Sequence, residues 1–225
     1  MKFDCEQFTL QPLSAQREWT FENFPVLRAQ ISLLEPSSPD AWRNIRRFYR
    51  LQSRAFLKYC QGEVFPWARK EAENALSNSV PAVCFEAELS AQTTYQSGQL
   101  WSLYTQTRDT AFPGAPTLHR WGDTWNLSTG YPIRLNAFFP PRSHWKKRFL
   151  SAVAAQIRRQ EQHGLARYHP GWQKLIKRYF SPHNFYLTPE GIAIFYPMYA
   201  IAPAAEKIPV FVLPYDGEPP LKPLR

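Results

Sequence analysis

The chain has 225 residues, a formal net charge of +9 at neutral pH, 44% hydrophobic residues and 20% charged residues. These proportions are typical of a globular protein with a sizeable core, and they exclude disorder of the whole chain. The 9 glycines follow no period, which excludes a collagen-like fibre. No run approaches the ~18 consecutive apolar residues of a membrane-spanning helix. Near the N-terminus, Asp4, Glu6 and Gln7 interrupt the apolar run that a secretory signal would need.

Glycine and cysteine spacing argue against several kinds of site. The two closest glycines, Gly164 and Gly171, are seven residues apart, so no glycine-rich loop for a nucleotide phosphate is predicted. The three cysteines are an odd number without a C-x-x-C pair, which argues against a zinc ribbon and a disulfide scaffold. A bridge between Cys60 and Cys84 remains an alternative to two buried free thiols.

The N-terminal half is predicted to alternate strands and helices. In chain order the predicted elements are a polar lead-in (1–21), a strand (24–34), a helix capped by Ser38 and Pro39 and ended by Gly62, a second helix (66–78), and a hairpin of two strands (82–95 and 100–108) around a turn at 96–98.

Apolar residues of the first predicted helix recur every three or four positions, which predicts one core-facing stripe. The predicted stripe consists of Ala41, Ile45, Phe48, Gln52, Ala55, Phe56 and Tyr59.

The C-terminal half is predicted to begin with a Pro/Gly connector at 111–117, the best candidate for an internal boundary. The elements predicted after it are a hairpin (121–127 and 131–135), a long helix from Ser143 to 162, a helix (170–180), and three strands (185–187, 192–196 and 210–213). Strands interspersed with helices and joined mainly by hairpins predict an α+β fold, an antiparallel sheet with helices packed on it.

Positive charge is concentrated in the predicted helices. Residues 39–60 carry six Lys and Arg against Asp40, and residues 142–180 carry ten against Glu161. In the first helix, five cations spaced by 4, 3, 4 and 4 residues form one stripe, and none has an acidic residue four positions away. This stripe predicts either a solvated face, neutralised by acids such as Glu71 and Glu73, or a surface for an anionic partner. The candidate binding residues are Arg43, Arg47, Arg50, Arg54, Lys58, Lys146 and Lys147.

No catalytic motif is found. The five histidines include no i,i+4 pair on a helix, and no serine stands in a G-x-S-x-G sequence. Glu86 and Glu88 share a strand face roughly 6–7 Å apart, a separation within reach of a glycosidase pair, although such pairs usually face solvent. We therefore predict no catalytic residue, metal or cofactor, and no nucleic-acid partner.

The C-terminal half resembles a known family. The segments that carry the resemblance are NFYLTPEGIAIFY (184–196), YAIAPAA (199–205), IPVFVLPY (208–215) and the hairpin WNLSTG (125–130). They resemble the C-terminal domain of RsiV-type anti-sigma factors, which also precedes the catalytic domain of PdaC-type peptidoglycan deacetylases. Residues 24–26, the Ser38-capped helix and residues 82–108 resemble the smaller domain that usually comes before it.

The resemblance implies an antiparallel sheet with packed helices and a non-catalytic, extracytoplasmic role. In RsiV-type proteins this region is a receptor for lysozyme. This chain contains no predicted membrane-spanning or sigma-binding segment and no deacetylase domain, so neither whole activity is expected of it. Its basic helices also suit an anionic ligand better than a cationic lysozyme.

These observations predict four parts with two adjoining α/β subdomains: a polar lead-in (1–21), a small PdaC accessory-like domain (22–110), an RsiV-like domain (111–216) and a Pro-rich tail (217–225). The expected function is a non-catalytic ligand-binding or sensor module of the bacterial cell envelope that recognises an anionic cell-wall polymer or a protein. The alternatives are a cell-wall glycan-acting enzyme with paired carboxylates, and a cytoplasmic polyanion-binding protein.

Overall fold

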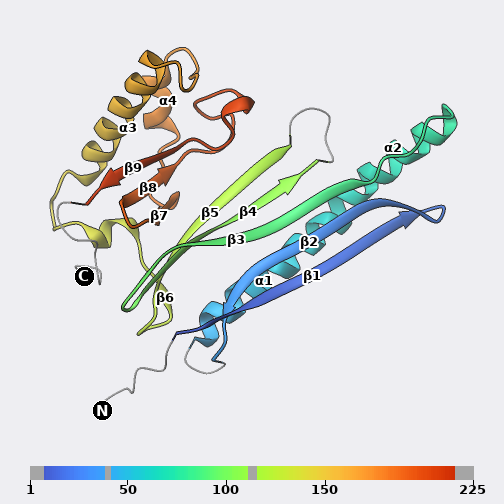
Figure 1. Ribbon diagram of the computed structural model, residues 1–225, viewed down its shortest axis with the longest axis horizontal. Helices are drawn as coiled ribbons and strands as arrows, with labels where there is room; N and C mark the ends of the chain where they lie inside the picture. The colour runs from blue at the N-terminus through green and yellow to red at the C-terminus, as the bar shows by residue number, and fades with distance from the viewer. Residues whose placement is uncertain (1–7, 39–41, 111–115, 216–225) are drawn as a thin grey trace. The chain divides into compact units, whose positions relative to one another are not determined.

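The protein is a mixed α/β structure, seen in a computed structural model that describes residues 8–38, 42–110 and 116–215 (Figure 1). A six-stranded sheet has the order β1-β2-β3-β4-β5-β6, and a three-stranded sheet has the order β7-β8-β9. The predicted α+β class, with helices packed on a mainly antiparallel sheet, is confirmed.

The chain divides into two compact units. The first comprises Met1–Ala91 and Thr107–Pro116, and the second Gln92–Gln106 and Thr117–Arg225. This division runs through the β3-β4 hairpin, whereas the domains expected at 22–110 and 111–216 are continuous. Those domain limits stay a prediction, and each compact unit is described by itself.

The first unit holds two strands, a long helical segment and parts of two further strands. Its elements are β1 (Leu10–Phe21), β2 (Phe24–Pro36), α1 (Arg43–Tyr59), the π-helical turn η1 (Cys60–Val64), α2 (Phe65–Ser77), and the parts of β3 (Phe85–Ser97) and β4 (Leu100–Asp109) within its bounds. β1 pairs antiparallel with β2, but β2 pairs parallel with β3. This pair is the parallel exception that the sequence did not indicate, because the helical segment is a crossover that returns the chain in the same direction.

Residues 10–21 form strand β1 and not the predicted polar lead-in. β1 lies at the edge of the sheet and pairs only with β2, so six of its twelve residues remain exposed. Trp19, at 9% exposure, is its one buried residue. The part of the predicted lead-in at 1–7 lies outside the described residues.

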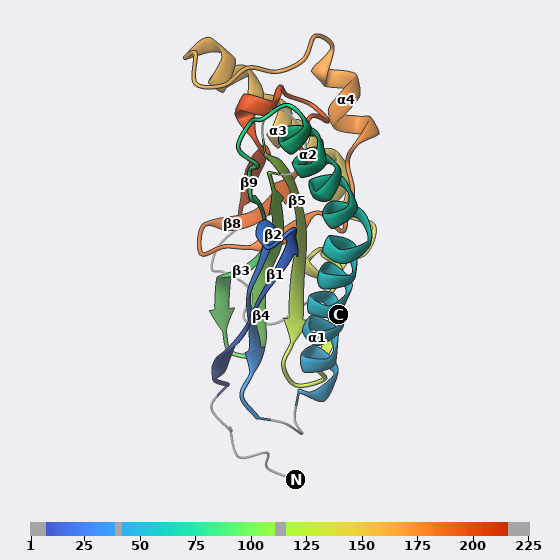
Figure 2. The ribbon, with the colours of Figure 1, turned by 90° about the vertical axis from the view of Figure 1, so that its right-hand side faces the viewer.

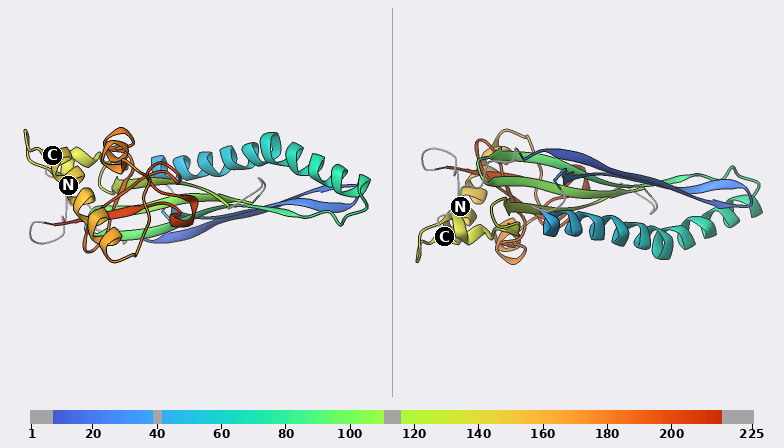
Figure 3. Two further views of the ribbon diagram at one scale, coloured as in Figure 1. Left: turned by 90° about the horizontal axis from the view of Figure 1, so that it is seen from above. Right: turned by 90° about the horizontal axis from the view of Figure 1, so that it is seen from below.

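The helices of the first unit follow one another without a break along β1 and β2 (Figures 2 and 3). Gly62 therefore does not end a helix as predicted. The wider π-helical turn that contains it keeps Cys60 and Val64 fully buried and leads directly into α2. α1 starts at Arg43 after Trp42, which makes no side-chain cap, so Ser38 does not cap it; Pro39 lies outside the described residues.

The buried face of α1 is rotated from the predicted stripe. The structure buries Ile45, Tyr49, Ser53 and Phe56, whereas Phe48 and Tyr59 are 41% and 38% exposed. Predicted Ala41 lies outside the described residues. The buried positions recur at four, four and three residues and continue with Cys60 and Val64, so the core face includes small and polar residues that a search for large apolar side chains overlooks.

The second unit contains the second sheet and two helices. Besides the middle of the β3-β4 hairpin, its elements are β5 (Thr117–Asn126), β6 (Tyr131–Pro132), η2 (Leu135–Phe138), α3 (Trp145–Gln162), α4 (Trp172–Arg178), β7 (Phe185–Leu187), β8 (Gly191–Phe195), η3 (Ala204–Glu206) and β9 (Val210–Pro214). These bounds confirm the predicted turn at 128–130 and the three C-terminal strands, whereas the turn predicted at 96–98 lies at 98–99 because β3 continues to Ser97. α3 begins one residue after His144, without a side-chain cap, so the predicted Ser143 cap is wrong.

All five residues of β8 are buried, because its sheet is covered on both faces. On one face, Ile192 and Ile194 belong to a core with Phe149 of α3 and Ile176 of α4. On the other face, Ala193 and Phe195 belong to a second cluster, with Tyr104 of β4 and Leu118 of β5 packed against it. This packing fixes α3 and α4 together on one side of the second sheet (Figure 1).

Candidate functional site

The candidate site is a groove between α3 and α4 in the second unit, with a volume of about 780 Å³. Its lining residues are Ser143, His144, Trp145, Lys146, Lys147, Leu150, Ser151, Ala154, Arg158, Gln173, Ile176 and Lys177. We call it the α3/α4 groove. A volume of this size is in the range that small-molecule and cofactor sites occupy.

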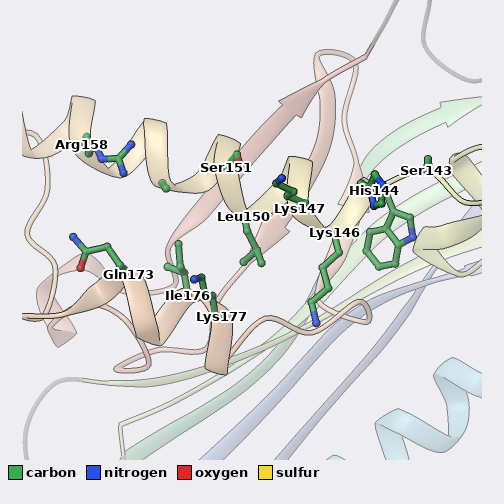
Figure 4. Close-up of a pocket in the computed structure, with 12 residues that line it drawn as sticks. Ser143, His144, Lys146, Lys147, Leu150, Ser151, Arg158, Gln173, Ile176 and Lys177 are labelled. Carbon is green, nitrogen blue, oxygen red and sulfur yellow. The ribbon is translucent and has the colours of Figure 1, made fainter.

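The floor of the groove is apolar and follows from the packing of the two helices. Leu150 and Ala154 lie one turn apart on α3, and Ile176 of α4 lines the groove with them. Figure 4 shows Leu150 and Ile176 in the space between the helices. Because Ile176 and Leu150 also contact the core, the floor is part of the folded framework and not a mobile surface.

The rim of the groove is cationic. Lys146 lies towards one end, Arg158 and Gln173 lie towards the other, and Lys177 lies between them beside Ile176 (Figure 4). Lys147 adds a fourth cation, and none of the lining residues is a carboxylate. The twelve residue steps from Lys146 to Arg158 span about 18 Å along an α-helix. Four cations around an apolar floor favour a ligand that carries negative charge on an elongated body.

Aromatic rings hold two of these cations in place. The Nζ atom of Lys146 lies 5.5 Å from the ring centroid of Phe180, and the Arg158 guanidinium carbon lies 6.0 Å from that of Trp172. The Trp172 ring is itself fixed, since its Nε1–H donates to Glu161 over 3.2 Å. Cations positioned this way lose less conformational freedom on binding an anion than free lysine and arginine side chains do.

The predicted binding residues do not form one site. Lys146 and Lys147 lie in the groove of the second unit, whereas the five cations of the predicted stripe lie on α1 of the first unit. Within the part of the chain that the structure describes, Arg43, Arg47, Arg54 and Lys58 are exposed and form no ion pair.

Arg50 differs from the other cations of the stripe because Glu35 neutralises it. Its Nε atom lies 2.8 Å from Glu35 Oε2, and Arg46 lies 3.7 Å from the other carboxylate oxygen. The Glu35 side chain also accepts a hydrogen bond from Gln11 and is 3% exposed. Chiefly the hydrogen bond from Arg50 lowers the pKa of Glu35. Arg50 therefore belongs to a structural ion pair and is not a candidate ligand contact.

The pair Glu86 and Glu88 does not lie in a pocket that the structure reveals. The Glu86 side chain is 67% exposed and lies 3.9 Å from Arg108. It also lies beside Arg28 in the register of β2 and β3, and Arg28 pairs with Glu18 at 2.7 Å. Alternating charges thus run across four strands. This arrangement is a solvated sheet face, the simpler of the two interpretations of Glu86 and Glu88.

The cysteines, the possible metal ligands and the helix hydropathy of the described residues point to no further site. Cys60 and Cys84 are free, so the alternative of a bridge between them is not realised. Across residues 8–38, 42–110 and 116–215, no cluster of three or more His, Cys, Asp or Glu is placed to hold a metal ion. No helix among those same residues is both long enough and apolar enough to cross a bilayer.

The sequence analysis missed Arg158, Lys177 and the hollow between them. A signal for Arg158 was present in the sequence, because Lys147, Ser151, Ala154 and Arg158 are spaced by four, three and four residues and so share one face of α3. No comparable signal indicated that the seven-residue α4 packs beside that face, because this follows from tertiary packing alone.

The fold and the groove together describe a mixed α/β protein with a cation-rimmed groove between two helices. Residues 136–216, which include α3, α4 and the second sheet, match the family model described as "Protein of unknown function (DUF3298)". This match lies in the part of the chain whose segments carry the family resemblance. No curated protein sequence matches the chain.

Two crystal structures share this fold over almost the whole chain. A member of the DUF3298 family from Bacteroides fragilis NCTC 9343 is 12% identical, with a TM-score of 0.66 and coverage of 93% of this chain and 91% of that chain. A DUF3298 family protein from Pseudomonas aeruginosa PAO1 is 15% identical, with a TM-score of 0.58 and coverage of 92% and 91%. At these identities the likeness concerns the fold alone.

Proposed function

We propose that the protein is a non-catalytic binding or sensor module of the bacterial cell envelope, and that its α3/α4 groove binds an anionic cell-wall component. The observation that carries the proposal is the groove itself, in which Lys146, Lys147, Arg158 and Lys177 surround an apolar floor without a carboxylate among the lining residues.

The chemistry of the groove supports binding more than turnover. Its lining side chains supply positive charge, hydrogen-bond donors and an apolar floor, which are the means of holding an anion. A glycosidase would need two carboxyl groups facing each other across the substrate. The candidate pair, Glu86 and Glu88, belongs to a solvated strand face, and the groove offers no acid to replace it.

The assignment to the cell envelope rests on the resemblance of residues 184–215 to RsiV-type and PdaC-type proteins. The DUF3298 match over residues 136–216 overlaps these residues, and its description names no function. Gram-positive walls and peptidoglycan carry phosphate and carboxylate groups at regular spacing along a flexible chain. A groove with cations at both ends of an 18 Å face fits a ligand of this kind.

Titration calorimetry with teichoic-acid fragments and with muropeptides tests the proposal. We expect binding that weakens as salt is raised, because bound anions displace counterions, and no change in the ligand after binding. The double variant Lys146→Gln/Lys177→Gln should bind at least tenfold more weakly. Lys174→Gln is the matched control, since Lys174 lies on α4, is exposed and does not line the groove.

Three results would contradict the proposal. Equal affinity of the double variant and the control would show that the groove is not the site. Hydrolysis or deacetylation of the fragments, abolished by Glu86→Gln, would show that the protein is an enzyme. Heparin binding that depends on Arg47 and Arg54 but not on the groove would favour the polyanion-binding alternative.

A further inference from the structure

We propose that the exposed face of α1 in the first unit is a second binding surface, and that it takes an acidic amphipathic helix of a partner protein. This inference goes beyond the proposed function, because it concerns the other compact unit and another class of ligand. It rests on two parallel strips of side chains that α1 presents to solvent.

The first strip is cationic. It consists of Arg43, Arg47, Arg54 and Lys58, which are exposed and have no ion-pair partner among the described residues. Their spacing of four, seven and four residues places them along one line, which extends about 22 Å over four turns. Like charges four residues apart on a helix repel one another and destabilise it slightly. An anionic partner would offset this repulsion, which no acidic side chain of the described residues neutralises.

The second strip is apolar and lies beside the first. It consists of Phe48, Leu51, Ala55 and Tyr59, spaced by three, four and four residues. Leu51 is 51% exposed and Phe48 is 41% exposed, and Ala55 is exposed between larger neighbours. Side chains of this kind normally face the core, and here Ile45, Tyr49 and Phe56 occupy that side of the helix.

The two strips together specify the partner. A flexible polyanion would contact the cations and leave Leu51 in water. A membrane surface would need apolar side chains that reach past the cations, whereas Phe48, Leu51 and Tyr59 are only 41%, 51% and 38% exposed. A helix with one acidic and one apolar stripe matches both strips over the same four turns. Ala55 leaves room for a larger side chain of that helix, and Arg47, Leu51 and Ala55 form a ridge at four-residue spacing, as in helix-in-groove recognition.

Selection of displayed random 16-residue peptides on the intact protein tests this inference. We expect a consensus with Asp or Glu and with Leu, Ile or Phe at spacings of three and four residues. For the selected peptide, measured by fluorescence anisotropy, Leu51→Gln should weaken binding about tenfold, and Arg47→Gln/Arg54→Gln should weaken it by a similar factor and reduce its salt dependence.

Matched controls separate this surface from general effects. Leu76→Gln changes a leucine of α2 that is 41% exposed, and Lys70→Gln removes an exposed cation of α2; both should leave the affinity unchanged. The groove variant Lys146→Gln/Lys177→Gln should also leave it unchanged, so this test and that of the proposed function fail independently.

Three results would overturn the inference. One is a selection that yields no acidic amphipathic consensus. Another is polyglutamate that binds as tightly as the selected peptide, which would mean that the apolar strip plays no part. The third is phosphatidylglycerol vesicles that bind the wild type but not Leu51→Gln, which would assign the surface to a membrane instead.

Discussion

Gly122 lies in the second unit at a position where no side chain fits. A Cβ atom at Gly122 of β5 would lie 1.9 Å from the carbonyl oxygen of Phe185 in β7, and 3.2 Å from a ring carbon of Phe195. An ordinary carbon–oxygen contact is about 3.3 Å or longer. Gly122→Ala therefore requires β5 and β7 to move apart by more than 1 Å, and both strands are held by buried neighbours on either side.

Overpacking of this kind destabilises a core by about 1–3 kcal/mol, and backbone atoms yield less readily than the end of a flexible side chain. We expect the upper part of that range for Gly122→Ala, with a melting temperature lowered by about 6–12 °C for a chain of this size. Urea unfolding followed by tryptophan fluorescence, together with calorimetry, measures both quantities.

Gly62 provides a control of opposite sign. It lies within the continuous helical segment, and a Cβ there would meet nothing within 4 Å. Gly62→Ala should stabilise the protein by about 0.5–1 kcal/mol, since alanine loses less backbone entropy in a helix. A Gly122→Ala variant as stable as the wild type would refute the close approach of β5 and β7. A destabilised Gly62→Ala variant would refute the unbroken helix.

Three further predictions concern buried polar groups. Glu35→Gln should destabilise the first unit by about 3 kcal/mol. Because the native pKa of Glu35 is lowered, its contribution should be present above the ordinary carboxyl pKa near 4.5 and be lost as the pH falls through the native value, a dependence that the variant should lack on acid titration by circular dichroism. Ser102→Ala should remove the 2.8 Å hydrogen bond that the Leu187 amide donates to Ser102 Oγ, so hydrogen exchange at Leu187 should accelerate, and unchanged protection would refute the contact. Burial raises the pKa of Cys60 to about 12, so iodoacetamide at pH 8 should modify Cys60 only after unfolding; rapid labelling of the native protein would contradict this.

The strands and most helices could be predicted because their patterns are local. Residues 185–187, 192–196 and 210–213 carried continuous apolar runs bounded by proline and glycine, and the structure forms β7, β8 and β9 there. β1 could not be predicted in the same way. An edge strand has one partner and mostly exposed side chains, so its sequence resembles that of a loop.

Helix ends were harder to predict than helix positions. Glycine commonly ends a helix, yet the helical segment continues through Gly62. The wider π-helical turn lets both Cys60 and Val64 reach the core. Serine is a preferred N-cap residue, yet the hydroxyl oxygen of Ser143 makes no hydrogen bond in the described structure. In both cases tertiary packing overrides the local preference of one residue.

The charge stripe shows what a pattern along one helix can and cannot indicate. Its spacing correctly placed Arg43, Arg47, Arg54 and Lys58 on an exposed face, but it gave no reason to separate Arg50 from them. The reason lies in β2, where Ala29, Ile31, Leu33 and Glu35 alternate towards the core, so a carboxylate on that face needs a cation. The inward register of the preceding strand indicates that Glu35 needs a cation, but only the structure shows that Arg50, with Arg46 at 3.7 Å, supplies it. The cations that remain after such internal pairs are removed, on α1 and around the α3/α4 groove, are the ones to which the two proposals assign an external anion.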